Sequence, residues 1–168
     1  MRISRIIPAL LAAAALCGCS DYGKLSQHIP TVQKIKDFTV YETAQSTRTW
    51  TLSSDLAEMT EGDPVARLTD PVMVYLKGQQ STVKSKQGFY DFDKKTVLLT
   101  GDVVAVSKKD AITLRTEALN YSPDRALVWT DAKVRLTQGG TVADGVGLEA
   151  KPDLSEIVLK HQRTKLGQ

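Results

Sequence analysis

Cysteine is almost absent from this sequence: among 168 residues it occurs twice, as Cys17 and Cys19. Since residues 20–168 contain none, a disulfide framework and a thiolate metal site are excluded from that part of the chain. Histidine is equally scarce, and His28 and His161 lie near opposite ends of the sequence. No imidazole is therefore placed to share a metal ion or a proton with another, and we expect neither a metal nor another cofactor.

An excess of one charge is also lacking, because 22 Lys and Arg residues are interleaved with 19 Asp and Glu residues. A nucleic-acid-binding protein would show a basic face or an RNA-binding aromatic motif, and neither is present, so we expect no nucleic-acid partner. No glycine pattern is followed by a helical pattern that would cradle a phosphate. Asp91 and Asp93 lie on one face of a strand pattern, but they are more simply turn formers. We therefore predict that the protein is not an enzyme.

The sequence has no apolar run long enough to cross a membrane as a helix. Residues 6–16 form an apolar run of eleven after the positive segment 1–5, whereas a spanning helix needs about 20 residues. Residues 1–18 are therefore typical of an export signal. Its end, Leu16-Cys17-Gly18-Cys19, resembles a bacterial lipobox, which implies that Cys19 becomes lipidated with fatty acyl chains such as palmitate. An ordinary cleavable signal with chance cysteines is the alternative.

What the sequence does have is strand pattern, most clearly in residues 89–137. From Thr96 onward, apolar residues alternate between two faces, which is a period of two and hence a β-strand. One face carries Val97, Leu99, Val103 and Ala105, and the other carries Leu98, Val104 and Val106. Gly101-Asp102 interrupts this run, and a glycine inside a strand pattern predicts a bulge or a bend.

This segment also repeats itself at a spacing of about 30 residues. A shift of 31 places Tyr90 on Tyr121 and Val97 on Val128, and a shift of 29 places Leu119 on Leu148. Each unit reads as a strand, a turn containing Asp, and another strand. Self-similarity at a fixed period indicates stacked supersecondary units that share one apolar surface.

The rest of the chain shows the same character. Residues 19–34 are polar and predict a tether, and the alternating runs 35–42 and 48–53 predict the first hairpin. Residues 54–62 fit either a single helical turn or an irregular strand that joins the sheet. Residues 65–77 read as two strands hinged at Asp70-Pro71, and Gly78 opens the next turn.

Together these patterns predict an all-β fold: a twisted antiparallel β jelly roll, open on one side, with about a dozen short strands and almost no helix. We expect this domain to cover residues 35–160, with a flexible tail at 161–168. Several runs are apolar on both faces, such as residues 96–106. Such runs fit either a well-packed dry core or a sheet that encloses an apolar groove.

A set of short motifs resembles the LptC family of lipopolysaccharide export proteins, in order and in approximate spacing, from about residue 35 to residue 160. The motifs are Trp50-Thr51-Leu52 followed by Ala57, Leu68-Thr69-Asp70-Pro71-Val72, Leu99-Thr100-Gly101-Asp102-Val103, Thr116-Glu117-Ala118-Leu119-Asn120-Tyr121 and Gly145-Val146-Gly147-Leu148. The resemblance implies an OstA-like β jelly roll whose interior binds the acyl chains of lipopolysaccharide. It also implies partners: the inner-membrane export transporter (LptB, LptF and LptG) and the periplasmic bridge LptA.

The lipobox departs from the single transmembrane helix that holds other members of this family. A lipid anchor on Cys19 implies a periplasm-facing protein tied to a membrane. Ser20 would permit sorting to the outer membrane in enteric bacteria, but the transport role favours the inner membrane. The alternative function is another envelope lipoprotein, such as an outer-membrane assembly factor or a lipoprotein carrier, without a transporter partner.

The period of two also selects candidate residues for the lining of the groove, on the hypothesis that they share one face. These candidates are Leu52, Leu68, Val72, Val74, Leu99, Val103, Leu114, Val134, Leu136 and Leu148. No catalytic or metal-binding residue is predicted.

Overall fold

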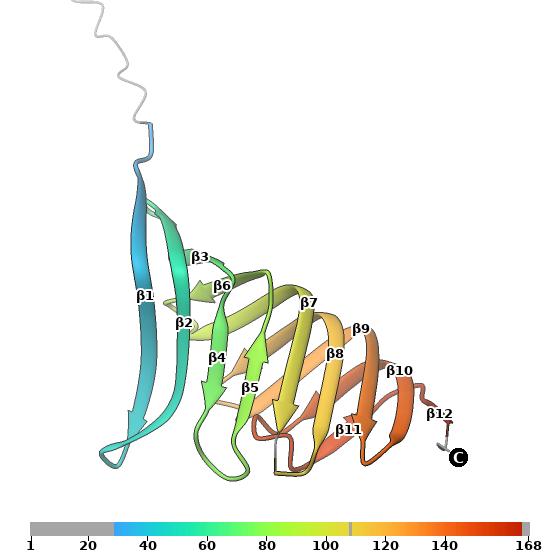
Figure 1. The fold of residues 1–168 in the computed structure, drawn as a ribbon. Helices are drawn as coiled ribbons and strands as arrows, with labels where there is room; N and C mark the ends of the chain where they lie inside the picture. Colours follow the sequence, from blue (N-terminus) through green and yellow to red (C-terminus); the bar gives the residue numbers. More distant parts are fainter. Residues whose placement is uncertain (1–28, 108, 166–168) are drawn as a thin grey trace, which may run out of the picture.

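The computed structural model describes residues 29–107 and 109–165, which form a single antiparallel sheet of twelve strands (Figure 1). No helix occurs within these two ranges. The predicted all-β, jelly-roll-like fold is therefore confirmed. The predicted signal, Cys19 and most of the tether lie outside the described residues. In the part that is described, no helix is long and apolar enough to cross a membrane.

The strands follow one another mostly as hairpins. In chain order they are β1 (Val32–Ala44), β2 (Thr47–Thr60), β3 (Val65–Thr69), β4 (Val72–Tyr75), β5 (Ser81–Lys84), β6 (Gln87–Asp91), β7 (Thr96–Ser107), β8 (Ile112–Ser122), β9 (Leu127–Gln138), β10 (Thr141–Ala150), β11 (Ile157–Leu159) and β12 (Arg163–Lys165). Across the sheet the order is β11-β10-β9-β8-β7-β5-β4-β2-β3-β6, with β1 paired to β2 and β12 to β10. The strands β1 and β12 extend into the expected tether and tail.

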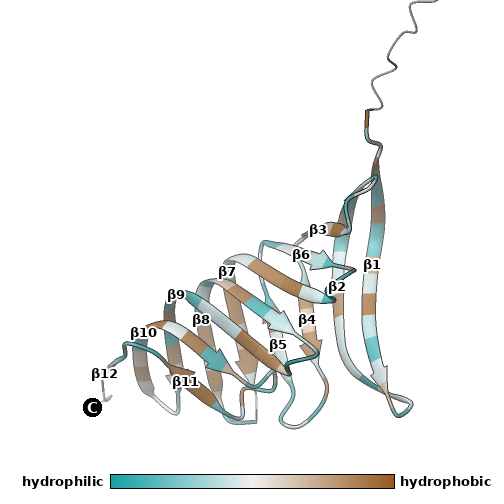
Figure 2. Cartoon of the chain, turned by 180° about the vertical axis from the view of Figure 1, so that it is seen from behind, coloured by the Kyte–Doolittle hydropathy of each residue, from teal (hydrophilic) through white to brown (hydrophobic). Residues whose placement is uncertain are grey.

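The long strands bend, so that the sheet folds back over itself and forms two half-sheets (Figures 1 and 2). The first half-sheet contains β4, β5, β12 and the adjoining parts of the long strands; the second contains β3, β6, β11 and the remaining parts. In β7 the bend falls between Thr100 and Val103, where the pairing register with β8 shifts. Gly101 there adopts φ +76°, which a residue with a side chain rarely does. The predicted interruption at Gly101-Asp102 is thus the fold line of the sheet.

The core lies between the two half-sheets. Along the first half-sheet, the register sets six inward side chains in one row: Leu52, Met73, Val83, Ala105, Leu114 and Leu136. These residues join one hydrophobic cluster with inward residues of the second half-sheet. Along the strands, hydrophobic residues alternate with hydrophilic ones (Figure 2), as expected for a sheet with one buried face.

The repeat detected in the sequence corresponds to successive hairpins of the second half-sheet. Tyr90 pairs with Val97, Val97 with Tyr121, and Tyr121 with Val128. All four side chains are buried. The two residues of each repeated pair therefore occupy equivalent positions in one inward-facing row.

The helical alternative for residues 54–62 is wrong, because residues up to Thr60 continue β2. The Ser54 side chain bonds the neighbouring strand β3 instead of capping a helix: its Oγ donates to the Thr69 carbonyl at 2.6 Å and accepts from the Thr69 amide at 3.1 Å. Leu56 to Met59 then pair with β3. The second alternative, a strand that joins the sheet, is confirmed.

Candidate functional site

The interior between the half-sheets is one hydrophobic cluster of buried side chains. Leu52, Leu114 and Leu148 have no exposed surface, and Leu99 and Val103 have almost none. Buried polar side chains there are small hydroxyls, such as Thr130 and Ser107. Such an interior offers van der Waals contact and exclusion of water, and its buried ionisable side chains are the phenols of Tyr90 and Tyr121.

The predicted groove residues mostly lie in this interior. Seven are buried: Leu52, Leu68, Leu99, Val103, Leu114, Val134 and Leu148. Leu136 is half-buried and packs against the same cluster. Whether these residues contact a lipid remains a prediction, but the structure brings the eight together on the inward surface.

Val72 and Val74 lie on the opposite face. In β4 it is Met73 that pairs with Leu52 and is buried, so its two neighbours point outward. The prediction from the sequence continued the alternation of β3 into β4 without a break at the hinge Asp70-Pro71. The alternation of inward and outward residues shifts by one position at the hinge, because Asp70 has a φ of +48° and Pro71 is buried. The inward residue Met73 was missed for the same reason, and Val83 on β5 was also not among the candidates.

The mouth is the name used here for the side of the molecule where the free hairpin ends of both half-sheets lie. Near it, an aromatic cluster joins the buried rings of Trp50, Tyr90 and Tyr121 to the exposed ring of Phe92. The Trp50 ring is 5.7 Å from that of Tyr121 and 6.3 Å from that of Tyr90, and the Tyr90 ring is 4.8 Å from that of Phe92. Burial raises the pKa of the Tyr121 phenol well above its usual value, and the nearby Tyr75 and Glu42 add to the shift.

Glu42 on β1 accepts a hydrogen bond from the indole N–H of Trp50 in this cluster. Its Oε2 accepts from Trp50 Nε1 at 2.7 Å and from Thr49 Oγ1 at 3.2 Å. We predict that Glu42→Ala lowers the free energy of unfolding by about 1–2 kcal/mol, because the buried indole N–H loses its acceptor. Glu42→Gln keeps an acceptor and should lose less. Urea unfolding followed by tryptophan fluorescence measures both, and equal stability of Glu42→Ala and the unsubstituted chain would contradict the assignment.

The mouth is bridged at one point by the turn between β10 and β11, residues 151–156, here called the strap. Ser81 Oγ donates to the Pro152 carbonyl, and the Gln79 amide donates to Asp153 Oδ2 at 3.3 Å. Pro152 and Leu154 of the strap are buried. The strap thus connects the end of the second half-sheet to the β4–β5 turn of the first.

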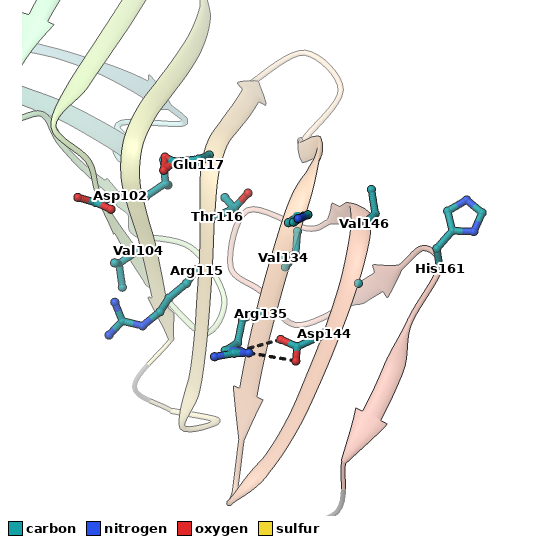
Figure 3. A pocket seen from close by; sticks show the side chains of 13 residues that line it. Asp102, Val104, Arg115, Thr116, Glu117, Val134, Arg135, Asp144, Val146 and His161 are labelled. Atoms are coloured by element: carbon teal, nitrogen blue, oxygen red, sulfur yellow. Dashed lines mark hydrogen bonds and ion pairs between the residues drawn. The ribbon is translucent and has the colours of Figure 1, made fainter.

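A hollow of about 980 Å³ lies on the outer surface where β7, β8, β9 and β10 bend (Figure 3). Its lining includes the exposed side chains of Arg115, Glu117 and Lys133. Arg135 binds Asp144 there through Nε–Oδ1 and Nη2–Oδ2 contacts of 2.7 and 3.1 Å. This hydrogen bond raises the pKa of Arg135. Both signs of charge are present, so the hollow favours neither an anion nor a cation.

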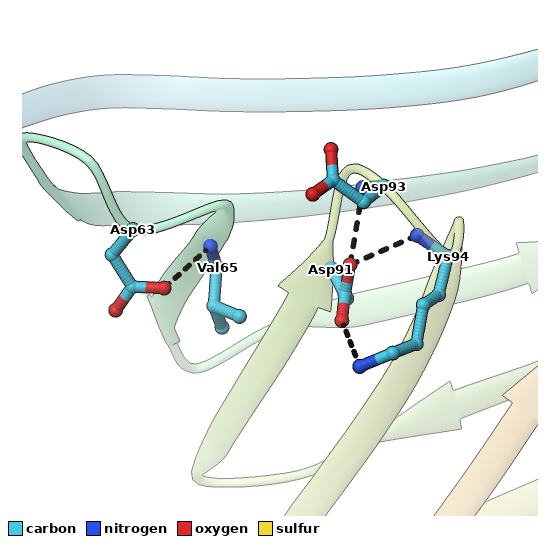
Figure 4. Close-up of polar contacts among 5 residues, drawn as sticks. All are labelled: Asp63, Val65, Asp91, Asp93 and Lys94. Atoms are coloured by element: carbon cyan, nitrogen blue, oxygen red, sulfur yellow. Dashed lines mark hydrogen bonds and ion pairs between the residues drawn. The ribbon is translucent and has the colours of Figure 1, made fainter.

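The acidic turn after β6 has a structural role, as the sequence indicated. Asp91 Oδ1 accepts from the amides of Asp93 at 3.0 Å and Lys94 at 2.9 Å, which closes the turn (Figure 4). These bonds and the ion pair with the Lys94 ammonium lower the pKa of Asp91. Asp63 caps Val65 in the same way at 3.0 Å. Among the described residues, no three His, Cys, Asp or Glu side chains are grouped to hold a metal ion.

The folded sheet and its apolar interior define an all-β protein of the jelly-roll type. The chain belongs to the LptC family, because the family model described as "Lipopolysaccharide-assembly, LptC-related" matches residues 14–166. No curated protein matches the chain. The resemblance of the motifs is therefore confirmed at the level of the family.

Membership of this family indicates the general function of the protein. It implies a role in lipopolysaccharide transport, together with the Lpt transport machinery, and an association with the cell envelope. The family is one of transport and structural components, not known as enzymes.

Proposed function

We propose that this protein receives lipopolysaccharide from the inner-membrane export transporter, formed by LptB, LptF and LptG, and passes it to the LptA bridge. The acyl chains lie between the two half-sheets while the polar part of the lipid stays at the mouth. The observation that carries the proposal is the continuous apolar row on the inward surface, from Leu52 to Leu136. Each buried CH₂ group of an acyl chain contributes about 0.8 kcal/mol, so no catalytic group is needed to hold it.

The unpaired edges of the sheet support end-to-end docking with the two partners. In the described residues, β1 pairs with β2 on one side only, through twelve of its thirteen residues. Its side chains are mostly exposed, and Val32, Ile35 and Tyr41 are among the exposed large hydrophobics. A long unpaired strand is an aggregation hazard unless a partner strand completes the sheet. At the other end, β11 and β12 offer a second edge.

The lipid anchor on Cys19 completes the proposal by holding the domain at the periplasmic face of the inner membrane. From Cys19 to Val32, where β1 begins, the chain extends at most about 45 Å, at 3.3–3.6 Å per residue. Two or more acyl chains on one residue give a stable anchor, whereas a single chain gives marginal binding. The tether thus lets the mouth lie close to the membrane from which the lipid comes.

Site-specific photo-crosslinking in cells tests this proposal. A photoreactive amino acid is placed at Leu99 or at Leu136, which face inward, and at their neighbours Leu98 and Thr137, which face outward. We predict lipopolysaccharide adducts at the inward positions that exceed those at the outward positions by about tenfold, as judged by immunoblots for lipopolysaccharide. Leu98 is a matched control because it has the same side chain as Leu99 on the same strand.

The four positions separate the possible outcomes. Adducts at Leu98 and Thr137 alone would mean that lipid contacts the outer surface, which contradicts binding between the half-sheets. Absence of adducts at all four positions, in chains that are folded and exported, would contradict the lipid-binding role. Recovery of outer-membrane partners alone with the acylated protein would contradict the placement beside the transporter.

A further inference from the structure

We propose that the strap, residues 151–156, is the gate through which the acyl chains reach the interior; this inference rests on the proposed function. The interior is closed in this structure, because Leu52, Leu114 and Leu148 have no exposed surface. A ligand of several acyl chains therefore fits only if the half-sheets separate at the mouth. The strap is the element of the second half-sheet that bonds the β4–β5 turn of the first, across 71 to 74 residues of sequence.

The strap is built to move as a unit. Its own hydrogen bonds close it internally: the Lys151 amide donates to the Glu156 carbonyl at 3.0 Å, and the Leu154 amide donates to the Lys151 carbonyl at 2.9 Å. Asp153 Oδ1 accepts from the Ser155 amide at 3.0 Å and from its hydroxyl at 2.7 Å. These bonds persist if the strap swings away. Opening parts Trp50 of the first half-sheet from Tyr90 and Tyr121 of the second and breaks the contacts that the strap makes with the first half-sheet.

Those contacts are few and imperfect. Leu154 inserts into the core, with 2% of its surface exposed, yet its φ is +62°, a strained conformation for a residue other than glycine. Across the contact, Gln79 Oε1 is buried without a hydrogen-bond partner among the described residues. A buried acceptor without a donor disfavours the closed arrangement. Opening leaves the backbone of Leu154 unchanged, because the strap moves as a unit, but it exposes Gln79 Oε1 to water and so releases the free energy that the unpaired acceptor stores.

A reversible covalent lock tests the gate. A Cβ atom built on Gly78 lies 3.5 Å from Asp153 Cβ, within the range of disulfides. In the Gly78→Cys, Asp153→Cys double variant of the full chain, oxidation fixes the strap to the β4–β5 turn. We expect oxidised protein to bind purified, fluorescently labelled lipopolysaccharide at least tenfold more weakly than reduced protein, with dithiothreitol restoring binding.

The matched control is a disulfide at the other end of the same hairpin. A Cβ built on Gly147 lies 3.4 Å from Lys160 Cβ, so Gly147→Cys, Lys160→Cys places the same bond next to the fold line, where it leaves the strap free. Oxidation should leave its binding unchanged. The unsubstituted chain, which carries Cys17 and Cys19, is measured in both redox states, and circular dichroism verifies that each variant is folded.

The outcomes distinguish the gate from the proposed function. Equal binding by the oxidised and reduced strap variants overturns the gate and leaves lipid binding intact. Equal losses in the strap and control variants also overturn it, because the hairpin and not the strap would then control access. Absence of binding by the unsubstituted chain contradicts the proposed function itself.

A second variant works without a disulfide. Ser81→Ala removes the hydroxyl that donates to Pro152, so the gate opens more often, and we expect labelled lipopolysaccharide to associate severalfold faster. An unchanged or slower association rate in a folded Ser81→Ala chain overturns the gate.

Discussion

Replacing Leu114 by alanine is expected to lower the free energy of unfolding by about 2–5 kcal/mol, the largest loss foreseen for a single substitution in this fold. Leu114 lies in the middle of β8, where it pairs with Ala105 on β7 and Leu136 on β9, and none of its surface is exposed. The substitution removes buried apolar surface and leaves a cavity. Ala105 across the strand is too small to fill that cavity, so little relaxation is available.

Thr113→Ala is the matched control for this prediction. Thr113 precedes Leu114 on the same strand, but it faces outward and pairs with Val106 and Thr137. Its replacement should cost within about 1 kcal/mol, the range of strand propensities. Urea unfolding followed by circular dichroism measures both variants. If Leu114→Ala and Thr113→Ala were equally stable, the two half-sheets would not be held together by the row to which Leu114 belongs.

The predictable part of this fold was the part encoded by local periodicity. Alternation in residues 96–106 placed Val97, Leu99, Val103 and Ala105 on one face, which is the buried face of the strand, because a strand face is determined by neighbours two residues apart. The repeat likewise placed Tyr90 and Tyr121 at equivalent positions. Glycine inside a strand pattern marked the bend at Gly101, since few other residues adopt its backbone conformation.

Features that depend on a phase change or on distant contacts were not predictable. The inward face of β4 follows from the geometry at Asp70, whose positive φ leaves no periodic trace in the sequence. The strap depends on Ser81 and Pro152, 71 residues apart, and neither residue type signals such a contact. The outer hollow is lined at the bend by residues that are consecutive in the sequence, such as Arg115, Thr116 and Glu117. Because a strand pattern assigns consecutive residues to opposite faces, no single face of such a pattern reveals this lining.

Gly88→Ala is the second substitution with a large expected effect, a loss of about 1–3 kcal/mol from overpacking. Gly88 lies on β6 between Leu68 on β3 and Leu99 on β7. A Cβ atom there would lie 2.9 Å from Cγ of Pro71 and 3.1 Å from Cδ2 of Leu99. The proline ring is buried and cannot rotate away. The gain of about 0.4–1 kcal/mol that accompanies Gly→Ala through the unfolded chain offsets only part of this clash.

A double-mutant cycle with Pro71→Ala isolates the clash from other consequences of the substitution. Pro71→Ala removes the Cγ atom that the new methyl group would meet at 2.9 Å, so Gly88→Ala should cost at least 1 kcal/mol less in that background than alone. Additive losses would mean that β6 shifts as a whole and that Pro71 does not limit it. Coupling would establish that the missing side chain at Gly88 is what lets the hinge proline seat in the core, where it resets the phase of β4 and turns Met73 inward.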